Sequence, residues 1–316
     1  MWALCFLAAS NFIRMKTLDP HTSAKADAIV KHLQLNLIVD FEKKILSGFA
    51  QWQIQVQPNT TEIFFDTRQL NIKNVWVDDV EANWNLNDEI KFLGKPLQVA
   101  ISDKNKMVKI EYETSPEAAA IQWLTPQQTA DKKFSFLFTQ SQAILARTWI
   151  PCQDGPGIRF TYDAEISVPN NLMALMSAEN PKQKNDSGTY HFHMPQAIPS
   201  YLMALAVGDV EYKSLGENTG VYAEHAMIEK SAWEFADMQA MVDHAGKLYG
   251  AYDWGQYDVL VLPPSFPFGG MENPRLTFAT PSIISGDRSL VSLVAHELAH
   301  SWSGNLVTNA TWDDFW

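Results

Sequence analysis

Two histidines and a glutamate in the last part of this sequence have the spacing of a metal site. His296, Glu297 and His300 form the string H-E-L-A-H. On a helix, residues four apart lie on one face about one turn from each other, so both imidazoles can bind a single Zn²⁺. The glutamate between them is then placed to act as a general base on a metal-bound water. A catalytic zinc needs three protein ligands, so a third ligand must come from elsewhere in the fold.

The residues around this motif predict the helix that it requires. Gly304 and Asn305 signal its end, and Asp287 or Ser289 could cap its start. The histidines are then expected in mid-helix. The alternative is a helix with two surface histidines that bind nothing, and the helical spacing of the apolar residues argues against it. These residues are Leu290, Val291, Leu293, Val294 and Leu298.

A glycine-rich string precedes the histidine motif. It runs P-F-G-G-M-E-N over residues 267–273. Gly269 and Gly270 would let the backbone approach a ligand closely, and Glu272 could pair with a cationic group of a substrate. Taken alone, the string is better interpreted as an ordinary Gly-Gly turn with a solvated glutamate.

Together, the two strings resemble the zinc aminopeptidase family of aminopeptidase N and leukotriene A(4) hydrolase. The similarity is greater to the leukotriene A(4) hydrolase-like branch and extends from about His32 to Trp316. Five further stretches carry it: T-Q-S-Q-A at 139–143, I-P-C-Q-D at 150–154, W-G-Q-Y-D at 254–258, L-P-P-S-F-P at 262–267 and S-W-S-G-N-L-V-T-N at 301–309.

The resemblance implies a Zn²⁺-dependent enzyme that hydrolyses the N-terminal residue of peptides. Glu297 would be the general base, and Glu272 would bind the free α-ammonium group of the substrate. The backbone of Gly269 and Gly270 would run beside the bound peptide. Epoxide hydrolase activity on a lipid is left open. Further cleft residues implied by the resemblance are Met271, Gln142, Ala143, Trp312, Phe315 and Phe268, the last standing where this branch usually has a tyrosine.

The family's third zinc ligand is a glutamate whose spacing from His300 places it beyond Trp316. The oxyanion-stabilising tyrosine and a helical C-terminal domain would also follow there. We therefore expect these 316 residues alone to bind zinc weakly and to be inactive. Two other interpretations are a non-catalytic pseudo-peptidase scaffold that keeps the peptide groove, and an unrelated zinc endopeptidase, against which Glu272 argues.

The rest of the chain predicts two structural regions. Residues 32–210 carry strand patterns separated by turns, as in the alternation of Ala50, Trp52 and Ile54 with glutamines, and predict an antiparallel β-sandwich or saddle domain. Residues 211–316 predict a long amphipathic helix over 228–248, strands at 257–262 and 276–280, and the zinc helix. This order resembles the first part of a thermolysin-like α/β zinc peptidase domain. Residues 1–31 are interpreted as an extension. Further strands are expected at 62–67, 107–114, 134–139, 159–168, 189–194 and 200–207.

Composition indicates a soluble globular protein, with 46% hydrophobic and 19% charged residues. The net charge of −12 and the lack of a basic cluster argue against a nucleic-acid partner. No apolar run is long enough to predict a transmembrane helix. Cys5 and Cys152 are expected to be free thiols, and His191 and His193 surface residues rather than a second metal site.

The N-terminal segment allows two interpretations. Residues 2–10 are apolar and resemble part of a signal peptide, although no basic residue precedes them. Met15 could equally be the true start of the protein. We expect a cytoplasmic protein, with export through a partial signal segment as the alternative.

Overall fold

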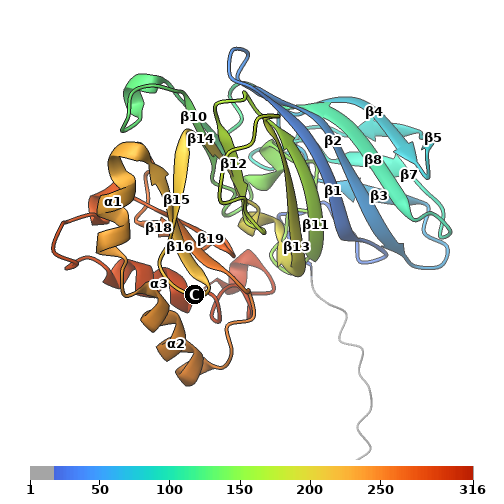
Figure 1. The fold of residues 1–316 in the computed structure, drawn as a ribbon. Helices are drawn as coiled ribbons and strands as arrows, with labels where there is room; N and C mark the ends of the chain where they lie inside the picture. The colour runs from blue at the N-terminus through green and yellow to red at the C-terminus, as the bar shows by residue number, and fades with distance from the viewer. Residues whose placement is uncertain (1–17, 316) are drawn as a thin grey trace, which may run out of the picture.

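The computed structural model describes residues 18–315. Two regions lie side by side in Figure 1. Long strands coloured blue to green fill one side, and the orange and red segments with α1, α2 and α3 form the other.

The first region is built on a seven-stranded sheet. Neighbouring strands are antiparallel except β1 and β11, which pair in parallel. In β2, Ala50, Trp52 and Ile54 are buried while the glutamines between them reach solvent, so the predicted alternation is confirmed. In spatial order the strands are β13 (Thr189–Pro199), β11 (Arg159–Ser167), β1 (Ala28–Asp40), β2 (Ile45–Val56), β8 (Met107–Glu113), β4 (Asn71–Val77) and β5 (Val80–Glu81).

Two smaller sheets complete this region. Trp52 and Trp149 are fully buried in the shared core, and the indole of Trp52 donates a hydrogen bond to the carbonyl of Pro151 at 2.9 Å. The predicted β-rich fold is thus confirmed. One sheet contains β12 (Met173–Met176), β14 (Leu205–Gly208), β10 (Phe136–Thr139) and β9 (Ile121–Leu124), and the other β3 (Glu62–Phe65), β7 (Leu97–Ala100) and β6 (Trp84–Leu86).

Short 3-10 helices connect several of these strands. One of them corrects the strand predicted at 200–207, because η3 (Ser200–Leu202) occupies its first residues and β14 begins only at Leu205. The turn follows directly after Pro199, the last residue of β13. The others are η1 (Pro126–Gln128), η2 (Ala146–Thr148), η4 (Pro281–Ile283) and η5 (Trp312–Asp314).

The second region contains a mixed five-stranded sheet. Strands β16, β17 and β19 are parallel, and β18 pairs antiparallel with β19 at one edge. The strands predicted at 257–262 and 276–280 are confirmed. The sheet begins at Val210, and the domain boundary near residue 210 stays a prediction. In order the strands are β15 (Val210–Ser214), β16 (Thr219–Glu224), β17 (Tyr257–Val261), β19 (Leu276–Ala279) and β18 (Gly270–Met271).

The single long helix predicted over 228–248 is wrong in one respect, because the segment forms two helices. They are α1 (His225–Glu234) and α2 (Met238–Tyr249). Phe235 ends α1 and is buried in the same core as Met238, so the apolar pattern continues through the break. Periodicity alone could not reveal the interruption.

The helix that carries the histidine motif is shorter than predicted. Helix α3 covers Ser292–Ala299, so neither Asp287 nor Ser289 is its cap. Arg288 has a φ of 60°, a left-handed conformation that no α-helix accommodates. His296 therefore lies in the last turn, and His300 is the C-cap residue rather than a mid-helix residue.

The N-terminal residues that the structure describes are fastened to the first region. The carboxylate of Asp66 accepts hydrogen bonds from Thr22 and from Ser23. Strand β1 starts at Ala28, ahead of the boundary predicted at residue 32. The signal-like residues 2–10, Met15 and Cys5 lie outside the described residues.

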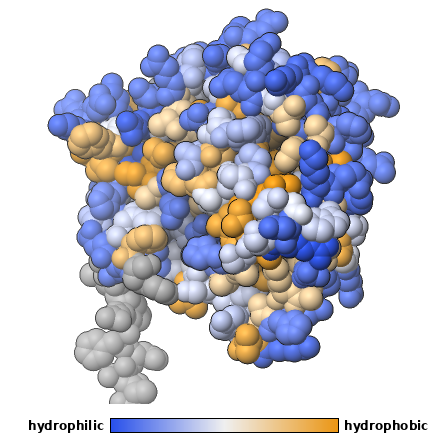
Figure 2. Space-filling view, turned by 90° about the vertical axis from the view of Figure 1, so that its left-hand side faces the viewer, coloured by the Kyte–Doolittle hydropathy of each residue, from blue (hydrophilic) through white to orange (hydrophobic). Residues whose placement is uncertain are grey.

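Surface and interior features agree with several expectations. Cys152 is buried and free. His191 and His193 are exposed and face Glu165 and Asp163. No described helix is long and apolar enough to cross a membrane. Figure 2, which shows the left-hand side of the view in Figure 1, has hydrophobic residues reaching the surface in several places between hydrophilic ones.

Candidate metal and substrate site

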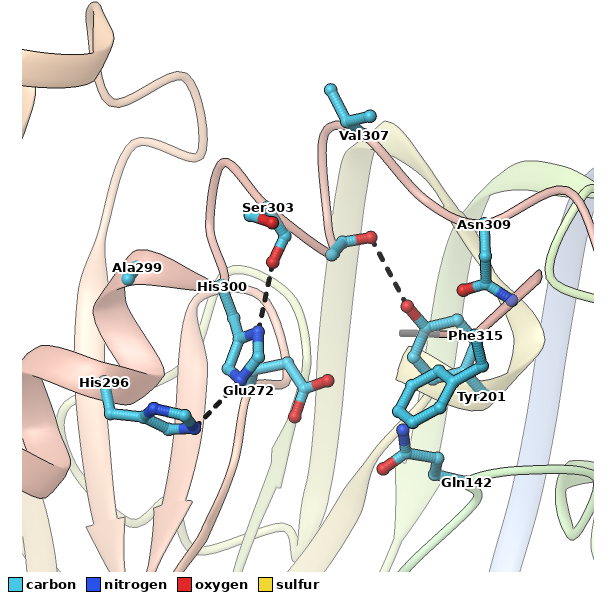
Figure 3. Close-up of a pocket in the computed structure, with 11 residues that line it drawn as sticks. Gln142, Tyr201, Glu272, His296, Ala299, His300, Ser303, Val307, Asn309 and Phe315 are labelled. Carbon is cyan, nitrogen blue, oxygen red and sulfur yellow. Dashed lines mark hydrogen bonds between the residues drawn. The ribbon is translucent and has the colours of Figure 1, made fainter. Parts of the chain in front are cut away.

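Helix α3 directs its two histidines toward one point. The Nε2 atoms of His296 and His300 are 3.2 Å apart (Figure 3). Two nitrogen ligands at 2.0–2.1 Å from a tetrahedral zinc would be about 3.3 Å apart. The Nδ1 atom of His300 lies 3.0 Å from the carbonyl oxygen of Ser303, so an Nδ1–H donated there leaves the Nε2 lone pair free for a metal. The two imidazoles therefore fit a zinc ion.

Glu297 lies on the inner side of the same helix. Its side chain is buried, and burial, with a smaller contribution from Glu272, raises its pKa to about 8. It packs against Gly270, where an added Cβ atom would come within 2.3 Å of Oε1 of Glu297. A glycine at this position of β18 is thus what allows the carboxylate of Glu297 to lie beside the edge strand.

Glu272 brings a second carboxylate to this place. One ligand atom each from Glu272, Glu297 and His300 lies within 4.8 Å of the other two. This group could itself hold a cation with two carboxylates and one imidazole. The two histidines are the better zinc pair, because imidazole suits zinc well and their facing Nε2 atoms already have the required separation.

A cavity of about 390 Å³ opens beside these groups, at the junction of the two regions. Gln142 and Tyr201 reach it from the first region, opposite His296, His300 and Glu272 (Figure 3). The remaining lining residues are Ala299, Ser303, Gly304, Val307, Asn309 and Phe315.

Several residues predicted for the cleft do not line this cavity. Met271, the last residue of β18, is buried and pairs with Phe278 of β19. Phe268 is 52% exposed and packs edge-on against Phe266. Ala143 follows Gln142 but does not contribute to the lining. Gly270 is the first residue of the edge strand β18 and Gly269 directly precedes it, and Trp312 packs against Tyr201 and Phe315.

Tyr201, Ser303 and Asn309 are lining residues that sequence reasoning did not propose. The strand predicted at 200–207 would include Tyr201, whereas the 3-10 turn η3 directs its ring into the cleft. Burial raises the pKa of its hydroxyl, and the nearby Glu272 carboxylate adds to that shift. The proline at position 199 was the one available signal that the strand ends before Tyr201.

Comparison with known families gives two matches. Residues 29–202 match the Peptidase M1 N-terminal domain, and residues 233–316 match the Peptidase family M1 domain. Leukotriene A-4 hydrolase from Xenopus laevis is 43% identical over 310 residues, covering 94% of this chain and 51% of that protein. Leucine aminopeptidase 2 from Yarrowia lipolytica is 43% identical over 284 residues, covering 89% of this chain and 44% of that protein.

Solved structures show the same relationship. Yeast LTA4 hydrolase in complex with bestatin superposes with a TM-score of 0.90 at 36% identity, over 96% of this chain and 48% of that one. An M1 zinc metallopeptidase from Deinococcus radiodurans has a TM-score of 0.74 at 19% identity, over 92% of this chain and 68% of that one, and shows the fold alone. The chain spans about half the length of the curated relatives it matches.

Proposed function

This chain belongs to the peptidase M1 family. We propose that it carries the residues with which an aminopeptidase binds zinc and the amino group of its substrate. One observation carries the proposal. The facing imidazoles of His296 and His300 lie in one cleft with the carboxylate of Glu272, and the buried Glu297 adjoins them. The relatives named leucine aminopeptidase 2 support the same activity.

His296 and His300 would hold the zinc ion. When bound there, zinc would polarise the scissile carbonyl and lower the pKa of a water molecule to about 7. The resemblance to the family predicts a glutamate as the third ligand, in addition to these two imidazoles. The donated Nδ1–H of His300 would keep its ring in the orientation that a metal requires.

Glu297 would act as the general base and then as the general acid in this reaction. Its carboxylate is buried within reach of His300 and has no ion-pair partner among the described residues. It would accept a proton from the attacking water at Oε and return it to the leaving amine. The same burial keeps competing solvent away from the carboxylate.

Glu272 would limit the enzyme to the first peptide bond. In a peptide, the α-nitrogen and the carbonyl carbon of the first residue are about 2.5 Å apart. The carboxylates of Glu272 and Glu297 approach within 4.8 Å of one another, which matches a substrate whose ammonium group meets one while the water that attacks its first carbonyl meets the other. Gln142, which lines the same cavity as Glu272 from the first region, would help to bind the amine.

The remaining substrate would continue along the edge strand. β18 ends the five-stranded sheet, so among the described strands one side of Gly270 has no neighbour. An extended peptide can add to such an edge through backbone hydrogen bonds. Peptides with a free N-terminus are therefore the proposed substrates.

The experiment compares an aminoacyl-arylamide with its N-acetyl form, using the intact, zinc-loaded protein. We expect hydrolysis of the free amine alone, a fall in kcat of about 10²–10⁴-fold for Glu297→Gln, and a rise in KM for Glu272→Gln. Equal rates for Glu297→Gln and the unchanged protein would support a non-catalytic scaffold instead. Efficient cleavage of the N-acetyl compound would indicate an endopeptidase.

A second activity is proposed for the same cleft, epoxide hydrolysis of a lipid. The name of the Xenopus relative, leukotriene A-4 hydrolase, suggests it. Ala299, Val307 and Phe315 contribute apolar groups to the lining of the cavity, as an acyl chain would require. Incubation of the zinc-loaded protein with a lipid epoxide, followed by detection of the diol, tests this activity. An unchanged epoxide would exclude it.

A further inference from the structure

We propose that Asn305 is a positioning residue that fixes the distance between Glu272 and the end of the metal-binding helix. This inference rests on the proposed function, because it assigns to Glu272 the binding of the substrate amine. Asn305 does not line the cavity. It acts through the two elements that it joins.

The first bond of Asn305 is to the histidine helix. Its backbone N–H donates to the carbonyl of His300 at 2.9 Å. The bond closes the turn after α3, and Gly304 within that turn has a φ of 129°. The position of Asn305 is therefore tied to the residue that ends the helix and supplies the second imidazole.

The second bond is to the backbone of Glu272. The side-chain Nδ2 of Asn305 donates to the carbonyl oxygen of Glu272 at 2.8 Å. The pairing of β18 with β19 extends only from Gly270 to Met271, so Glu272 lies just past the end of the ladder. The amide of Asn305 supplies a hydrogen bond to the chain at the point where the sheet stops doing so.

The third bond reaches the other region of the molecule. The Nη2 atom of Arg159, the first residue of β11, donates to the backbone carbonyl of Asn305 at 2.7 Å. The Nη1 and Nε atoms of the same guanidinium donate to Thr308 Oγ1 at 2.9 Å and to the carbonyl of Ala197 at 3.0 Å. The five donors of a guanidinium lie in one rigid plane, so Arg159 holds the segment after α3 against the first sheet.

Burial makes the loss of any of these hydrogen bonds costly. Asn305 is 2% exposed, so a lost partner cannot be replaced by bulk water. A substitution that turns the Nδ2 donor into an acceptor would set two oxygens against each other and move Glu272 away from the helix. A displacement of about 1 Å at a site of this kind is enough to change rates.

The test uses the intact, zinc-loaded protein with a free-amine aminoacyl-arylamide. Asn305→Asp keeps the size of the side chain and removes the donor. We expect kcat/KM to fall about tenfold, mainly through KM, with the zinc content per chain unchanged. Arg159→Gln, at the far end of the same connection, should raise KM by about threefold.

Asn180→Asp is the matched control. The Asn180 side chain also donates to backbone carbonyls, those of Met176 and Ala178, but does not line the cleft. It should lower the melting temperature without changing KM. An unchanged KM in Asn305→Asp, or a loss of activity explained by lost zinc, would overturn the inference. If that variant does not fold, an unchanged KM in Arg159→Gln overturns it.

The proposed function is judged separately in the same assay. It fails if the unchanged protein does not hydrolyse the free-amine substrate, or if Glu272→Gln leaves KM unaltered. If the unchanged protein hydrolyses the substrate and Glu272→Gln raises KM, a normal KM for Asn305→Asp refutes the positioning role alone.

Discussion

Buried carboxylates occur in both regions of the molecule, but their charges are compensated differently. In the β-rich region, Asp66 and Asp154 surround the buried guanidinium of Arg147, with Nε of Arg147 2.9 Å from Asp154 and Nη2 3.8 Å from Asp66. In the second region, Asp258 and Glu297 are buried without an ion pair among the described residues. Burial raises the pKa of Asp258 to about 7 and that of Glu297 to about 8.

The difference separates a structural use of buried charge from a chemical one. Burial raises the pKa of Asp154, but the facing guanidinium of Arg147 and its hydrogen bonds oppose that shift, and the pair fixes the chain segments around it. An uncompensated carboxylate costs stability at neutral pH and is available for a proton or a cation. The first region should therefore be sensitive to the loss of its cation, and the second should tolerate the replacement of a buried carboxyl by a neutral amide.

The largest effect on stability is expected for Arg147→Met. It would leave Asp66 and Asp154 buried without their cation and reduce the free energy of unfolding by about 3–5 kcal/mol. Glu297→Gln replaces a buried carboxyl, whose pKa of about 8 keeps it largely protonated at pH 7, with a neutral amide of similar shape, and should leave the free energy of unfolding unchanged or increase it. Urea unfolding of both variants measures the two values. A smaller loss for Arg147→Met than for Glu297→Gln would contradict the comparison.

The buried carboxyl of Asp258 predicts that the stability of the fold depends on pH. Its folded-state pKa of about 7 lies above the reference value of 3.8, so the folded protein holds this proton more tightly than the unfolded one. Stability is then lost as the pH rises from about 4 to about 7, by at most about 4 kcal/mol. The hydrogen bond from Gln256 and the charge of Lys182 reduce the shift without removing it.

Asp258→Asn should abolish that loss. The variant is expected to melt at a higher temperature than the unchanged protein at pH 8 and at the same temperature near pH 4. Melting curves across this range provide the measurement. A gap that does not depend on pH would mean that Asp258 is compensated in the folded protein after all.

The parts of the fold and the site that could be predicted from the sequence are those recorded in local residue patterns. The β-rich region was recognised because its buried positions alternate along the strands, as Trp52 and its neighbours do. The H-E-L-A-H motif was recognised because both histidines lie within one helical turn, a local relation. Backbone features that the apolar pattern does not record were missed. Tyr201 enters the cleft through a 3-10 turn, and the left-handed backbone at Arg288 prevents α3 from extending back to residue 288.

Sequence reasoning also could not foresee how the glycine string serves the site. Gly270 was proposed to let a substrate approach, and the geometry adds that it lets Glu297 approach. That contact joins residues from a strand and a helix, and no periodicity records it. It is nonetheless specific enough to test.

Gly270→Ala should reduce kcat by about 100-fold, equivalent to about 2.7 kcal/mol in the activation free energy. The added Cβ would come within 2.3 Å of Oε1 of Glu297 and force this carboxylate to move. Steady-state kinetics of the intact protein measures the effect. Gly246→Ala is the control, because a Cβ at Gly246 meets nothing within 4 Å. Equal rates in the two variants would mean that the position of Glu297 is not critical.

The smallest effect is expected on the outer face of the β-rich region. His193 lies 2.6 Å from Asp163, and both side chains are at least half exposed. Exposed ion pairs contribute about 0–1 kcal/mol, so His193→Asn should change the free energy of unfolding by less than about 0.5 kcal/mol and leave kcat/KM unaltered. Urea unfolding and the aminopeptidase assay measure both quantities. A loss of bound zinc in this variant would instead identify His193 as a metal ligand. The cleft between the two regions would then no longer be the sole candidate metal site among the described residues.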